Sequence, residues 1–418
     1  MATLYQNIIN EFGTPLYLYN GDKTIQQFQK IQNAFPDVKL KIKYAMKALN
    51  NINILKLLRS QGAGIDAVSI QEVYLALRAG YKPHEIIFTP NSIGFEELTE
   101  AIDQGVQINI DNLTLLEKFG AKYQHNYPCC IRINPHIMAG GNANISVGHI
   151  DSKFGVSIHQ IRHVERIVKN YGIHVNGLHM HTGSDILDAD IFLLGAEIIF
   201  QAARSFDKLN FIDFGSGFKV AYKDGDVETD IDKVGSIISR AFKEFCENYG
   251  RELELWFEPG KFIVSASGEL LVKSNVVKQT TSTVFVGVDS GQNHLLRPMM
   301  YNAYHEIENI TNLKGDKKLY TIVGNICETD TFGYDRFLNE VREGDILSIK
   351  NAGAYGFSMS NQYNSRPRPA EVLVLNGKYH LIRRRENMED LTRNEIELSS
   401  DCLSTLKKRP NPRAAAEL

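Results

Sequence analysis

Long apolar runs are missing from this 418-residue sequence: none approaches the roughly 18 consecutive apolar residues of a membrane-spanning helix. A strong charge imbalance is missing as well. The formal net charge is only −3, so neither nucleic acid nor an anionic membrane is expected as a partner. The first residues, MATLYQNIINEF, lack a basic start and an apolar core, so no secretory signal is expected. These absences, with 43% apolar and 23% charged residues, predict a soluble cytoplasmic protein.

Residues that form disulfides or bind metals are also few. The five cysteines are scattered without a C-x-x-C pair, and Cys129 and Cys130 are neighbours that point to opposite faces of an apparent strand. This pattern predicts reduced thiols rather than a disulfide framework. His179 and His181 face the same way on a strand, but no third ligand has a supporting spacing, so no metal site is predicted.

The sequence does contain strand-like runs, each followed by a helical stretch, and this unit recurs eight times. Alternating strands and helices imply a parallel sheet, and eight such units close an α/β barrel of the TIM type. The eight predicted strands are residues 40–46, 64–68, 85–89, 106–110, 129–134, 175–181, 210–214 and 254–257.

After Glu258 the pattern changes to β-branched and apolar residues without a sustained helical period. This is typical of an antiparallel β-barrel or sandwich, and a turn at Asn376-Gly377 predicts one of its hairpins. The short extended piece at residues 15–19 is expected to join this domain. The predicted organisation is an N-terminal segment at residues 1–24 that joins the β domain, an (β/α)8 barrel at 25–275, a C-terminal β domain at 276–406 and a disordered tail at 407–418.

One lysine stands where such a barrel keeps its chemistry. In residues 38–50, VKLKIKYAMKALN, apolar residues alternate with lysines up to Met46, and Lys47 follows at the carboxyl end of the first barrel strand. A lysine condenses with aldehydes if burial or a neighbouring cation keeps its amine neutral. Strict alternation would put Lys39, Lys41 and Lys43 on the same face as Lys47. A barrel interior cannot hold all four, so the early part must lie near the rim or the strand must carry a bulge.

Three of the predicted strands end in turns rich in small residues: residues 179–184 (HMHTGS), 213–217 (DFGSG) and 258–261 (EPGK). Glycines let backbone N–H groups approach an anion, and barrels often bind phosphate at the loops after strands seven and eight. Ser184 would add a hydroxyl and Lys261 a positive charge. A single turn of this kind is most often an ordinary loop, but three at adjacent strand ends predict a phosphate site.

The remaining polar residues at these strand ends suit a flat aromatic ligand. An imidazole at the end of strand six can stack on a planar ring. A buried Glu258 would need a cationic partner, such as a protonated pyridine nitrogen. With Lys47 for an aldehyde and a phosphate site beside it, the residues together describe pyridoxal phosphate (PLP).

At this point the chain resembles a known family, the fold-type III PLP-dependent decarboxylases, and within it the diaminopimelate decarboxylases. The likeness runs from about residue 13 to residue 394. The motifs that carry it are YAMKA (44–48), GIDAVS (64–69), SKFG (152–155), HMHTGS (179–184), EPGK (258–261), RPMMY (297–301), CETD (327–330) and GAY (353–355).

The resemblance implies a role for each matching residue. Lys47 would form the Schiff base with the cofactor, His181 would stack on its ring, and Glu258 would pair with the pyridine nitrogen. The other implied cofactor contacts are Ser184, Gly215, Gly217, Gly260, Lys261 and Tyr355. The implied substrate contacts are Lys261, Arg297, Tyr301, Glu328 and Tyr355. Lys47, Cys327 and His181 are the implied catalytic residues, with Cys327 as the proton donor.

In the family, the residues matching Cys327 and Glu328 reach into the partner subunit's site, which implies a homodimer with shared active sites. The implied reaction is the decarboxylation of meso-2,6-diaminopimelate to L-lysine, the last step of lysine biosynthesis. Two positions depart from the family: Lys261 stands where arginine is usual, and Gly215-Ser216-Gly217 replaces a triple glycine. Lysine lacks the two-pronged arginine contact, whereas a serine fits if its own φ is negative.

Other functions remain open. Sister decarboxylases of the same fold act on ornithine, L-lysine or carboxynorspermidine, but Arg297 and Glu328 favour a substrate with a second carboxylate and amine. A racemase on the same barrel would need an opposing tyrosine base. A PLP carrier without turnover would resemble the barrel alone, and a non-catalytic phosphate-binding barrel would have no use for Lys47.

Overall fold

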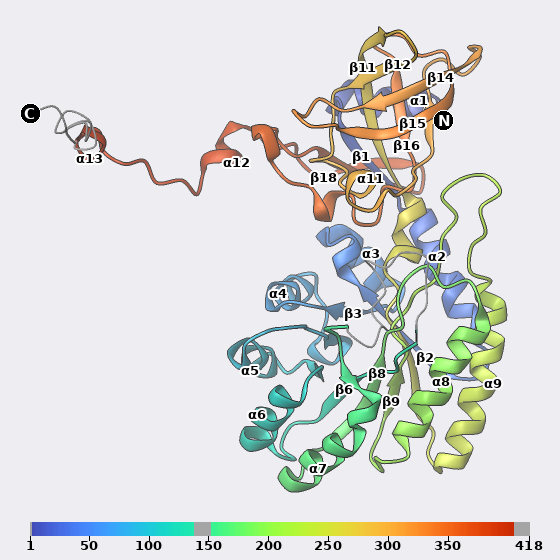
Figure 1. The fold of residues 1–418 in the computed structure, drawn as a ribbon, viewed down its shortest axis with the longest axis vertical. Coiled ribbons are helices and arrows are strands. Elements are labelled where there is room, and N and C mark those ends of the chain that lie inside the picture. The colour runs from blue at the N-terminus through green and yellow to red at the C-terminus, as the bar shows by residue number, and fades with distance from the viewer. Residues whose placement is uncertain (1, 138–151, 405–418) are drawn as a thin grey trace, which may run out of the picture.

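The computed structural model describes residues 2–137 and 152–404. It consists of a barrel domain and a β domain stacked along the long axis, and the stretch after the last strand extends away from both (Figure 1). The tail predicted at residues 407–418 lies outside the described residues.

The barrel contains all eight predicted parallel strands. Its strand order is β5-β4-β3-β2-β10-β9-β8-β6, and pairing of β5 with β6 closes the ring. A further short strand, β7 (Val156–Ser157), pairs with β6. The eight strands are β2 (Lys39–Ala45), β3 (Gly64–Ala67), β4 (Ile86–Phe88), β5 (Gln107–Ile110), β6 (Cys129–Asn134), β8 (Val175–Met180), β9 (Phe211–Asp213) and β10 (Glu254–Phe257).

Helices lie on the outside of the barrel (Figure 1). Several begin at an Asn, Ser or Asp whose side chain accepts a hydrogen bond from a free backbone N–H of the first turn, as Asn51 does from Asn53. The described helices are α1 (Ala2–Phe12), α2 (Gly21–Ala34), α3 (Ile52–Ser60), α4 (Ile70–Arg78), α5 (Phe95–Asp103), α6 (Leu113–Tyr123), α7 (Ile161–Tyr171), α8 (Ala189–Ala203), α9 (Ile231–Tyr249), α10 (Lys261–Val264), α11 (Arg297–Tyr301), α12 (Met388–Thr392) and α13 (Ser400–Ser404).

The β domain is present as predicted, with the N-terminal piece β1 as one of its strands. Most neighbours are antiparallel, but the sheet is mixed, since β1 pairs in parallel with β17 and β12 with β14. The hairpin at Asn376-Gly377 joins β17 to β18. Helix α1 was not predicted. The strands are β1 (Leu16–Asn20), β11 (Gly268–Gln279), β12 (Val284–Val288), β13 (Ile307–Asn309), β14 (Lys317–Val323), β15 (Thr331–Asn339), β16 (Ile346–Ile349), β17 (Ala370–Leu375) and β18 (Lys378–Arg383).

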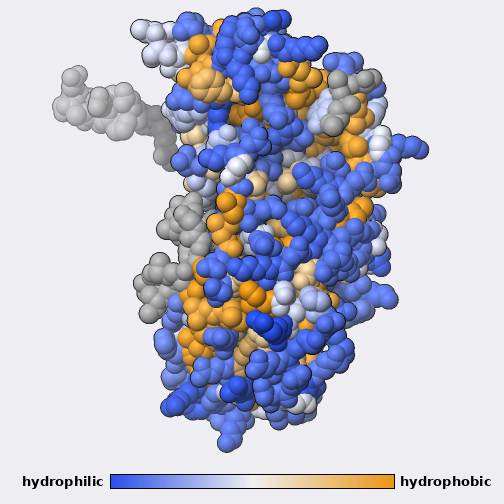
Figure 2. Space-filling model, turned by 90° about the vertical axis from the view of Figure 1, so that its right-hand side faces the viewer, coloured by the Kyte–Doolittle hydropathy of each residue, from blue (hydrophilic) through white to orange (hydrophobic). Residues whose placement is uncertain are grey.

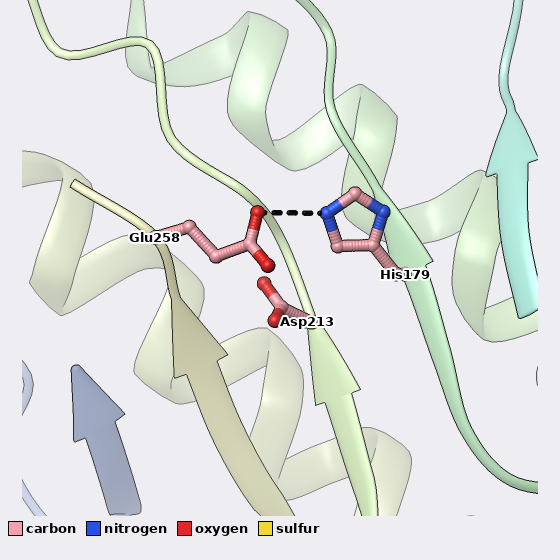
Figure 3. Close-up of side chains that lie close together, drawn as sticks. All are labelled: His179, Asp213 and Glu258. Carbon is pink, nitrogen blue, oxygen red and sulfur yellow. Dashed lines mark hydrogen bonds and ion pairs between the residues drawn. The ribbon is translucent and has the colours of Figure 1, made fainter. Parts of the chain in front are cut away.

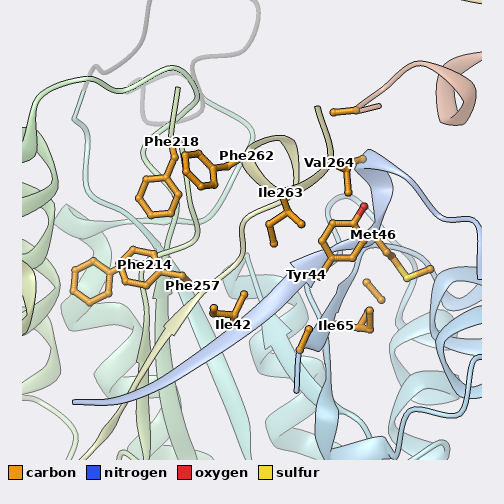
Figure 4. Packing of buried hydrophobic residues seen from close by; sticks show 14 of the residues in the cluster. Ile42, Tyr44, Met46, Ile65, Phe214, Phe218, Phe257, Phe262, Ile263 and Val264 are labelled. Carbon is orange, nitrogen blue, oxygen red and sulfur yellow. The ribbon is translucent and has the colours of Figure 1, made fainter. Parts of the chain in front are cut away.

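One hydrophobic core joins the two domains. Figure 4 shows its part around the first and last barrel strands, where Tyr44, Phe257 and Ile263 belong to one cluster of buried apolar side chains. The hydroxyl of Tyr44 donates to the carbonyl of Leu49, 3.0 Å away, and so ties the end of β2 to the chain beyond Lys47. Packing and this buried hydrogen bond fix the turn that carries Lys47.

The lysines of the first barrel strand are accommodated at the rim. Lys39 and Lys41 are exposed and lie 2.7 and 4.0 Å from Glu252 and Glu254. Lys43 is buried, with its Nζ 3.1 Å from the carbonyl of Glu85. The alternation of the strand ends at Ala45, and the 3-10 turn Met46–Ala48 gives the Lys47 side chain a direction different from that of the strand lysines. The rim explanation therefore holds for Lys39 and Lys41, whereas Lys43 is buried, with its Nζ 4.3 Å from the ring centre of Trp256.

Among the described residues, no helix has the length and apolar character needed to cross a membrane. None of the five cysteines forms a disulfide.

Candidate active site

A cavity of about 850 Å³ opens at the carboxyl ends of the barrel strands, where residues of the β domain also line it. Most of the predicted site residues lie in its wall, although they come from distant parts of the chain. Gly215, Cys327 and Glu328 are not among the lining residues. The predicted residues that line the cavity are Lys47, His181, Ser184, Gly217, Glu258, Gly260, Lys261, Arg297, Tyr301 and Tyr355.

Lys47 reaches the cavity from the turn after β2 and is paired with a carboxylate. Its Nζ lies 2.9 Å from Oδ2 of Asp66, which is fully buried at the end of β3. Burial opposes the charge on Lys47, but Asp66, Tyr355 and Glu258 outweigh it and raise its pKa. The raised pKa favours the charged form of Lys47 in the ligand-free protein, so the neutral amine that would react with an aldehyde is the less favoured form there.

Two residues of the β domain donate hydrogen bonds to the turn that carries Lys47. The backbone N–H of Tyr355 donates to the carbonyl of Ala48 over 2.8 Å, and the Ser358 hydroxyl donates to the same carbonyl over 3.1 Å. Tyr355 has a φ of +56°, which is uncommon for an aromatic residue and occurs mainly where the surrounding structure enforces it. Its backbone contact explains how the ring is kept at the cavity wall beside Lys47.

The loops after β8, β9 and β10 leave room for an anion close to the backbone. Gly217 has a φ of +134°, and a Cβ there would lie 2.7 Å from the carbonyl of Gly183. A Cβ on Gly260 would lie 3.0 Å from the carbonyl of Ala45, so a side chain at either position would crowd its neighbours. Ser216 does not take a positive φ, so this serine fits the loop as expected. Successive backbone N–H groups in glycine-containing loops of this kind can bind a phosphate.

His181 is a neutral ring at the cavity wall. Its Nδ1 accepts a hydrogen bond from the Ser216 N–H over 3.2 Å, which fixes the orientation of the imidazole. Burial and the cations Arg132 and Lys47 lower the pKa of His181 to about 3. An uncharged, oriented imidazole suits the predicted stacking on an aromatic ring.

Glu258 is a buried carboxylate at the end of β10. It accepts hydrogen bonds from Nε2 of His179 over 3.0 Å and from the hydroxyl of Thr89 over 3.3 Å. Burial opposes its charge, but His179, Lys47 and Arg132 outweigh burial and lower the pKa of Glu258 to about 2. The side chain is therefore an anion that can stabilise a positive charge in the cavity.

His179 is paired differently from the sequence expectation. Figure 3 shows it beside Glu258 and Asp213, and one ligand atom of each of the three lies within 4.8 Å of the others. This group does not include His181, the residue that the sequence analysis considered together with His179 as a possible metal pair. However, Nε2 of His179 is already hydrogen-bonded to Glu258, so the three side chains form a hydrogen-bonded histidine–carboxylate cluster.

Lys261, which replaces the arginine usual in the family that the sequence resembles, forms an ion pair inside the cavity. Its Nζ lies 2.5 Å from Oδ1 of Asp185, and Asp185 follows Ser184 in the loop after β8. Both side chains line the cavity, with 11% of Lys261 and 25% of Asp185 exposed. Arg297 lines the same cavity, and the position of the Lys261 ammonium group is fixed by its contact with Asp185.

Arg297 lies at the start of α11 and is surrounded by aromatic rings. One Nη atom donates to the hydroxyl of Tyr222 over 3.1 Å, and the guanidinium lies about 6 Å from the ring centres of Tyr301 and Tyr355. Its Nε is buried without a hydrogen-bond partner. A guanidinium held in this way has donors left for a carboxylate.

Cys327 and Glu328 lie elsewhere on this chain. Both are exposed, the backbone N–H of Cys327 donates to the Asn364 side chain over 3.0 Å, and the hydroxyl of Tyr363 donates to Glu328 over 2.8 Å. A proton donor in this place does not serve the cavity of its own chain.

Sequence reasoning missed several polar residues of the site, among them Asp66, Arg132, Asp185 and Tyr222. Asp66 and Arg132 are single charges within apolar strands, a pattern that indicates a buried functional charge and that could have identified them. Asp185 directly follows the motif at residues 179–184, which could have drawn attention to it, whereas nothing in the sequence around Tyr222 marks that residue.

Comparison with known proteins agrees with this geometry. A family model described as "Pyridoxal-dependent decarboxylase, pyridoxal binding domain" matches residues 22–265. The chain is 38% identical over 398 residues to diaminopimelate decarboxylase of Methanothermobacter thermautotrophicus, covering 93% of each chain. It is 37% identical over 397 residues to that of Campylobacter jejuni, covering 92% of this chain and 97% of the relative. The structure is similar to a crystal structure of diaminopimelate decarboxylase from Helicobacter pylori complexed with L-lysine, with a TM-score of 0.85 and 33% identity over 93% of this chain and 98% of that one.

Proposed function

Because the chain belongs to the diaminopimelate decarboxylases of the pyridoxal-dependent decarboxylase family, we propose that it converts meso-2,6-diaminopimelate to L-lysine and carbon dioxide. The observation that carries this proposal is the cavity itself. It holds Lys47 and the buried Glu258 together with the glycine loops, and Arg297 lies in the same wall.

The residues of the cavity fit pyridoxal phosphate. Gly217 and Gly260 line the cavity, and a side chain at either position would crowd the neighbouring backbone, so we propose that the glycine backbone there contacts the phosphate. The neutral ring of His181 suits the cofactor ring, and the ionised Glu258 suits a protonated pyridine nitrogen. The remaining cofactor contacts that we propose are Ser184, Gly215, Lys261 and Tyr355.

When bound, the cofactor supplies an aldehyde that bonds to amines and a ring that accepts the electron pair left by carbon dioxide. Lys47 supplies the amine to which the aldehyde is attached. Its Nζ carries an extra proton in the ion pair with Asp66 and must lose that proton before it can act as a nucleophile. Glu258 stabilises positive charge on the ring nitrogen, because it is itself held as an anion by His179, Lys47 and Arg132.

Substrate choice depends on the far wall of the cavity. We propose that Arg297 binds the carboxylate of the distal end with two of its N–H groups, and that Tyr301 lies against that end. Lys261 adds a charge that Asp185 partly neutralises, so Arg297 supplies the main attraction. Ornithine and L-lysine lack a distal carboxylate and would leave the half-buried guanidinium without its anion, which costs binding free energy.

We also propose a homodimer in which each copy completes the other's site. Cys327, as the proton donor, and Glu328, as the contact to the distal amine, are exposed and outside the cavity of their own chain, which supports a role toward a second copy. Exposed apolar residues support association: Leu319 and Phe337 are cross-strand partners on β14 and β15, with 44% and 70% exposure. On the face that Figure 2 displays, hydrophobic side chains likewise interrupt a largely hydrophilic surface.

We propose a cytoplasmic location as well. Cys327 is exposed and forms no disulfide, and this supports a reducing compartment.

A substrate panel tests the proposed reaction. Purified protein loaded with pyridoxal phosphate is given meso-diaminopimelate, ornithine, L-lysine or carboxynorspermidine in separate assays, and carbon dioxide is measured. Release from meso-diaminopimelate alone, with formation of L-lysine, is the expected result. Faster release from one of the other three would assign the chain to a sister activity.

A further inference from the structure

His179, Asp213 and Glu258 form a buried group at the carboxyl ends of three adjacent strands, β8, β9 and β10 (Figure 3). His179 and Asp213 are fully buried, and Glu258 is 8% exposed. The close approach of two carboxylates inside a protein needs a physical explanation, because like charges without water between them repel strongly.

The contacts of Glu258 account for one of the two charges. Nε2 of His179 and the hydroxyl of Thr89 both point at its oxygens, and the cations Lys47 and Arg132 also act on it. Its backbone N–H is anchored to the carbonyl of Gly215 over 2.5 Å. These contacts favour the ionised form of Glu258.

Asp213 has much less support for a charge. Oδ1 accepts one hydrogen bond, from the Gly215 N–H over 2.8 Å, while Oδ2 is buried with no hydrogen-bond partner. Burial, and then the charge of Glu258, raise the pKa of Asp213 well above its usual range. A proton on Oδ2 removes the repulsion and supplies this atom with a partner, because the O–H can donate to the neighbouring Glu258 carboxylate.

The other charged groups nearby agree with this assignment. Asp66 adds a third carboxylate, but it is bound to Lys47 and the two charges offset each other. Two further cations, Arg132 from β6 and the buried Lys43 from β2, interact with Asp213 without a hydrogen bond to its Oδ2, and His181 is neutral. With a proton on Asp213 and with Asp66 paired with Lys47, Glu258 is the one of these three carboxylates that remains ionised and free of an ion pair with Lys47.

His179 completes the arrangement as a second donor. A carboxylate oxygen only accepts hydrogen bonds, so Nε2 of His179 must carry its hydrogen toward Glu258. Nδ1 is buried without a partner, which suits an unprotonated ring nitrogen better than an N–H group.

We propose that His179 and Asp213 are positioning residues, which donate hydrogen bonds to Glu258 and hold it as the carboxylate that faces the cofactor ring nitrogen. The proposal rests on the proposed function in one respect, since it takes Glu258 to face that nitrogen. The proton on Asp213 is independent of the cofactor and can be tested without it.

The first test is infrared spectroscopy of the full-length, cofactor-free protein, with Asp213→Asn as the difference partner and 13C-labelled aspartate for assignment. A carbonyl band of a protonated carboxylic acid at neutral pH, present in the parent protein and absent from Asp213→Asn, is the expected result. The absence of this band in the parent protein would overturn the assignment of the proton, whatever ligand the cavity binds.

The second test uses holoenzyme prepared with pyridoxal phosphate that carries 15N in the ring, and the nitrogen chemical shift is measured. Asparagine keeps an acceptor toward Gly215 and a donor toward Glu258, so Asp213→Asn is expected to keep the shift of a protonated nitrogen. Asp213→Leu, which has neither group, is expected to move the shift toward that of neutral pyridine. The proposal is overturned if the Leu variant keeps the parent shift or if the Asn variant loses it.

His179 is tested with two amides of different reach. The amide nitrogen of Gln can occupy the position of Nε2, whereas that of Asn is one bond too short. His179→Gln is expected to keep the nitrogen shift, and His179→Asn to move it and to raise the cofactor dissociation constant about tenfold. Equal behaviour of the two variants would remove His179 from the proposal. If the parent protein does not bind the cofactor at all, the proposed function fails, while the infrared result still decides the state of Asp213.

Discussion

Nζ of Lys47 lies 2.9 Å from Oδ2 of Asp66, so the amine that we propose bonds with the cofactor forms an ion pair with a fully buried carboxylate, which helps to raise its pKa. Only the neutral amine reacts with an aldehyde. The ion pair therefore controls the pH at which the protein takes up its cofactor.

Replacing Asp66 by Asn is expected to shift cofactor attachment to lower pH. Asp66 helps to raise the pKa of Lys47, so without its charge a larger fraction of the amine is neutral at any given pH. The rate of appearance of the visible absorption band after mixing with pyridoxal phosphate, measured across pH, gives the midpoint. Glu254→Gln, on the far rim of the barrel, is the control and should not move it. A midpoint that stays in place for Asp66→Asn would show that the ion pair does not govern attachment.

Arg297→Lys is expected to raise KM for meso-diaminopimelate about 10- to 100-fold and to leave cofactor binding unchanged. Lysine keeps the charge but loses the second donor of the guanidinium and its contact with the surrounding rings. Steady-state kinetics and the visible spectrum measure the two effects. Tyr222→Phe removes only the hydroxyl that holds Arg297 and should raise KM less. A collapse of cofactor occupancy in Arg297→Lys would contradict its assignment to the substrate.

Acid is expected to destabilise the fold partly through buried histidines. His294 is buried between the Ser290 hydroxyl and the Pro367 carbonyl, at 3.0 and 3.1 Å, and burial is the main cause that lowers its pKa to about 4. An unfolded chain binds this proton near pH 6.5, so between pH 6.5 and 4 the unfolded state holds more protons. The free energy of unfolding therefore decreases as the pH is lowered from 6.5 to 4, by at most about 1.4 kcal/mol per pH unit for each such histidine.

Urea unfolding between pH 7 and pH 4.5 measures this slope. His294→Gln should show a smaller decline per pH unit, even if its stability at pH 7 is lower. His380→Gln, at an exposed position on β18, is the matched control and should keep the parent slope. An unchanged slope in His294→Gln would mean that His294 does not take up the proton on unfolding.

Two inactive variants are expected to restore activity to each other when mixed. Lys47→Ala removes the cofactor lysine, and Cys327→Ala removes the proposed proton donor. If each site takes Lys47 from one copy and Cys327 from the other, half of the randomly assembled dimers contain one intact site. The mixture then regains about one quarter of the parent activity. A mixture as inactive as its components, with exchange of subunits verified by mass spectrometry, would contradict shared sites.

The order of the barrel strands could be predicted from the sequence, because each strand is a short apolar run whose local pattern survives in the fold. The glycine loops could be predicted for the same reason, since a positive φ or a close backbone approach requires glycine at a particular position of the sequence. Lys47 was found because it follows such a strand directly. The barrel and its three loops were therefore accessible to local reasoning.

The partners of the charged residues could not be predicted in this way. The pairing of Asp185 with Lys261 joins loops that are 76 residues apart, and that of His179 with Glu258 joins strands 79 residues apart. Only the closed barrel brings these side chains together. The parallel pairing of β1 with β17 has the same cause, since it depends on where the two ends of the chain meet rather than on the pattern of either strand.

The most direct test of the account is the visible spectrum of the purified protein with pyridoxal phosphate, compared with Lys47→Ala and with Lys39→Ala, an exposed lysine of the same strand. The account predicts a visible band in the parent protein and in Lys39→Ala, its loss in Lys47→Ala, and release of carbon dioxide with formation of L-lysine when meso-diaminopimelate is added to the first two. A band that persists in Lys47→Ala, or its absence from the parent protein, would contradict the assignment of Lys47 as the residue that holds the cofactor.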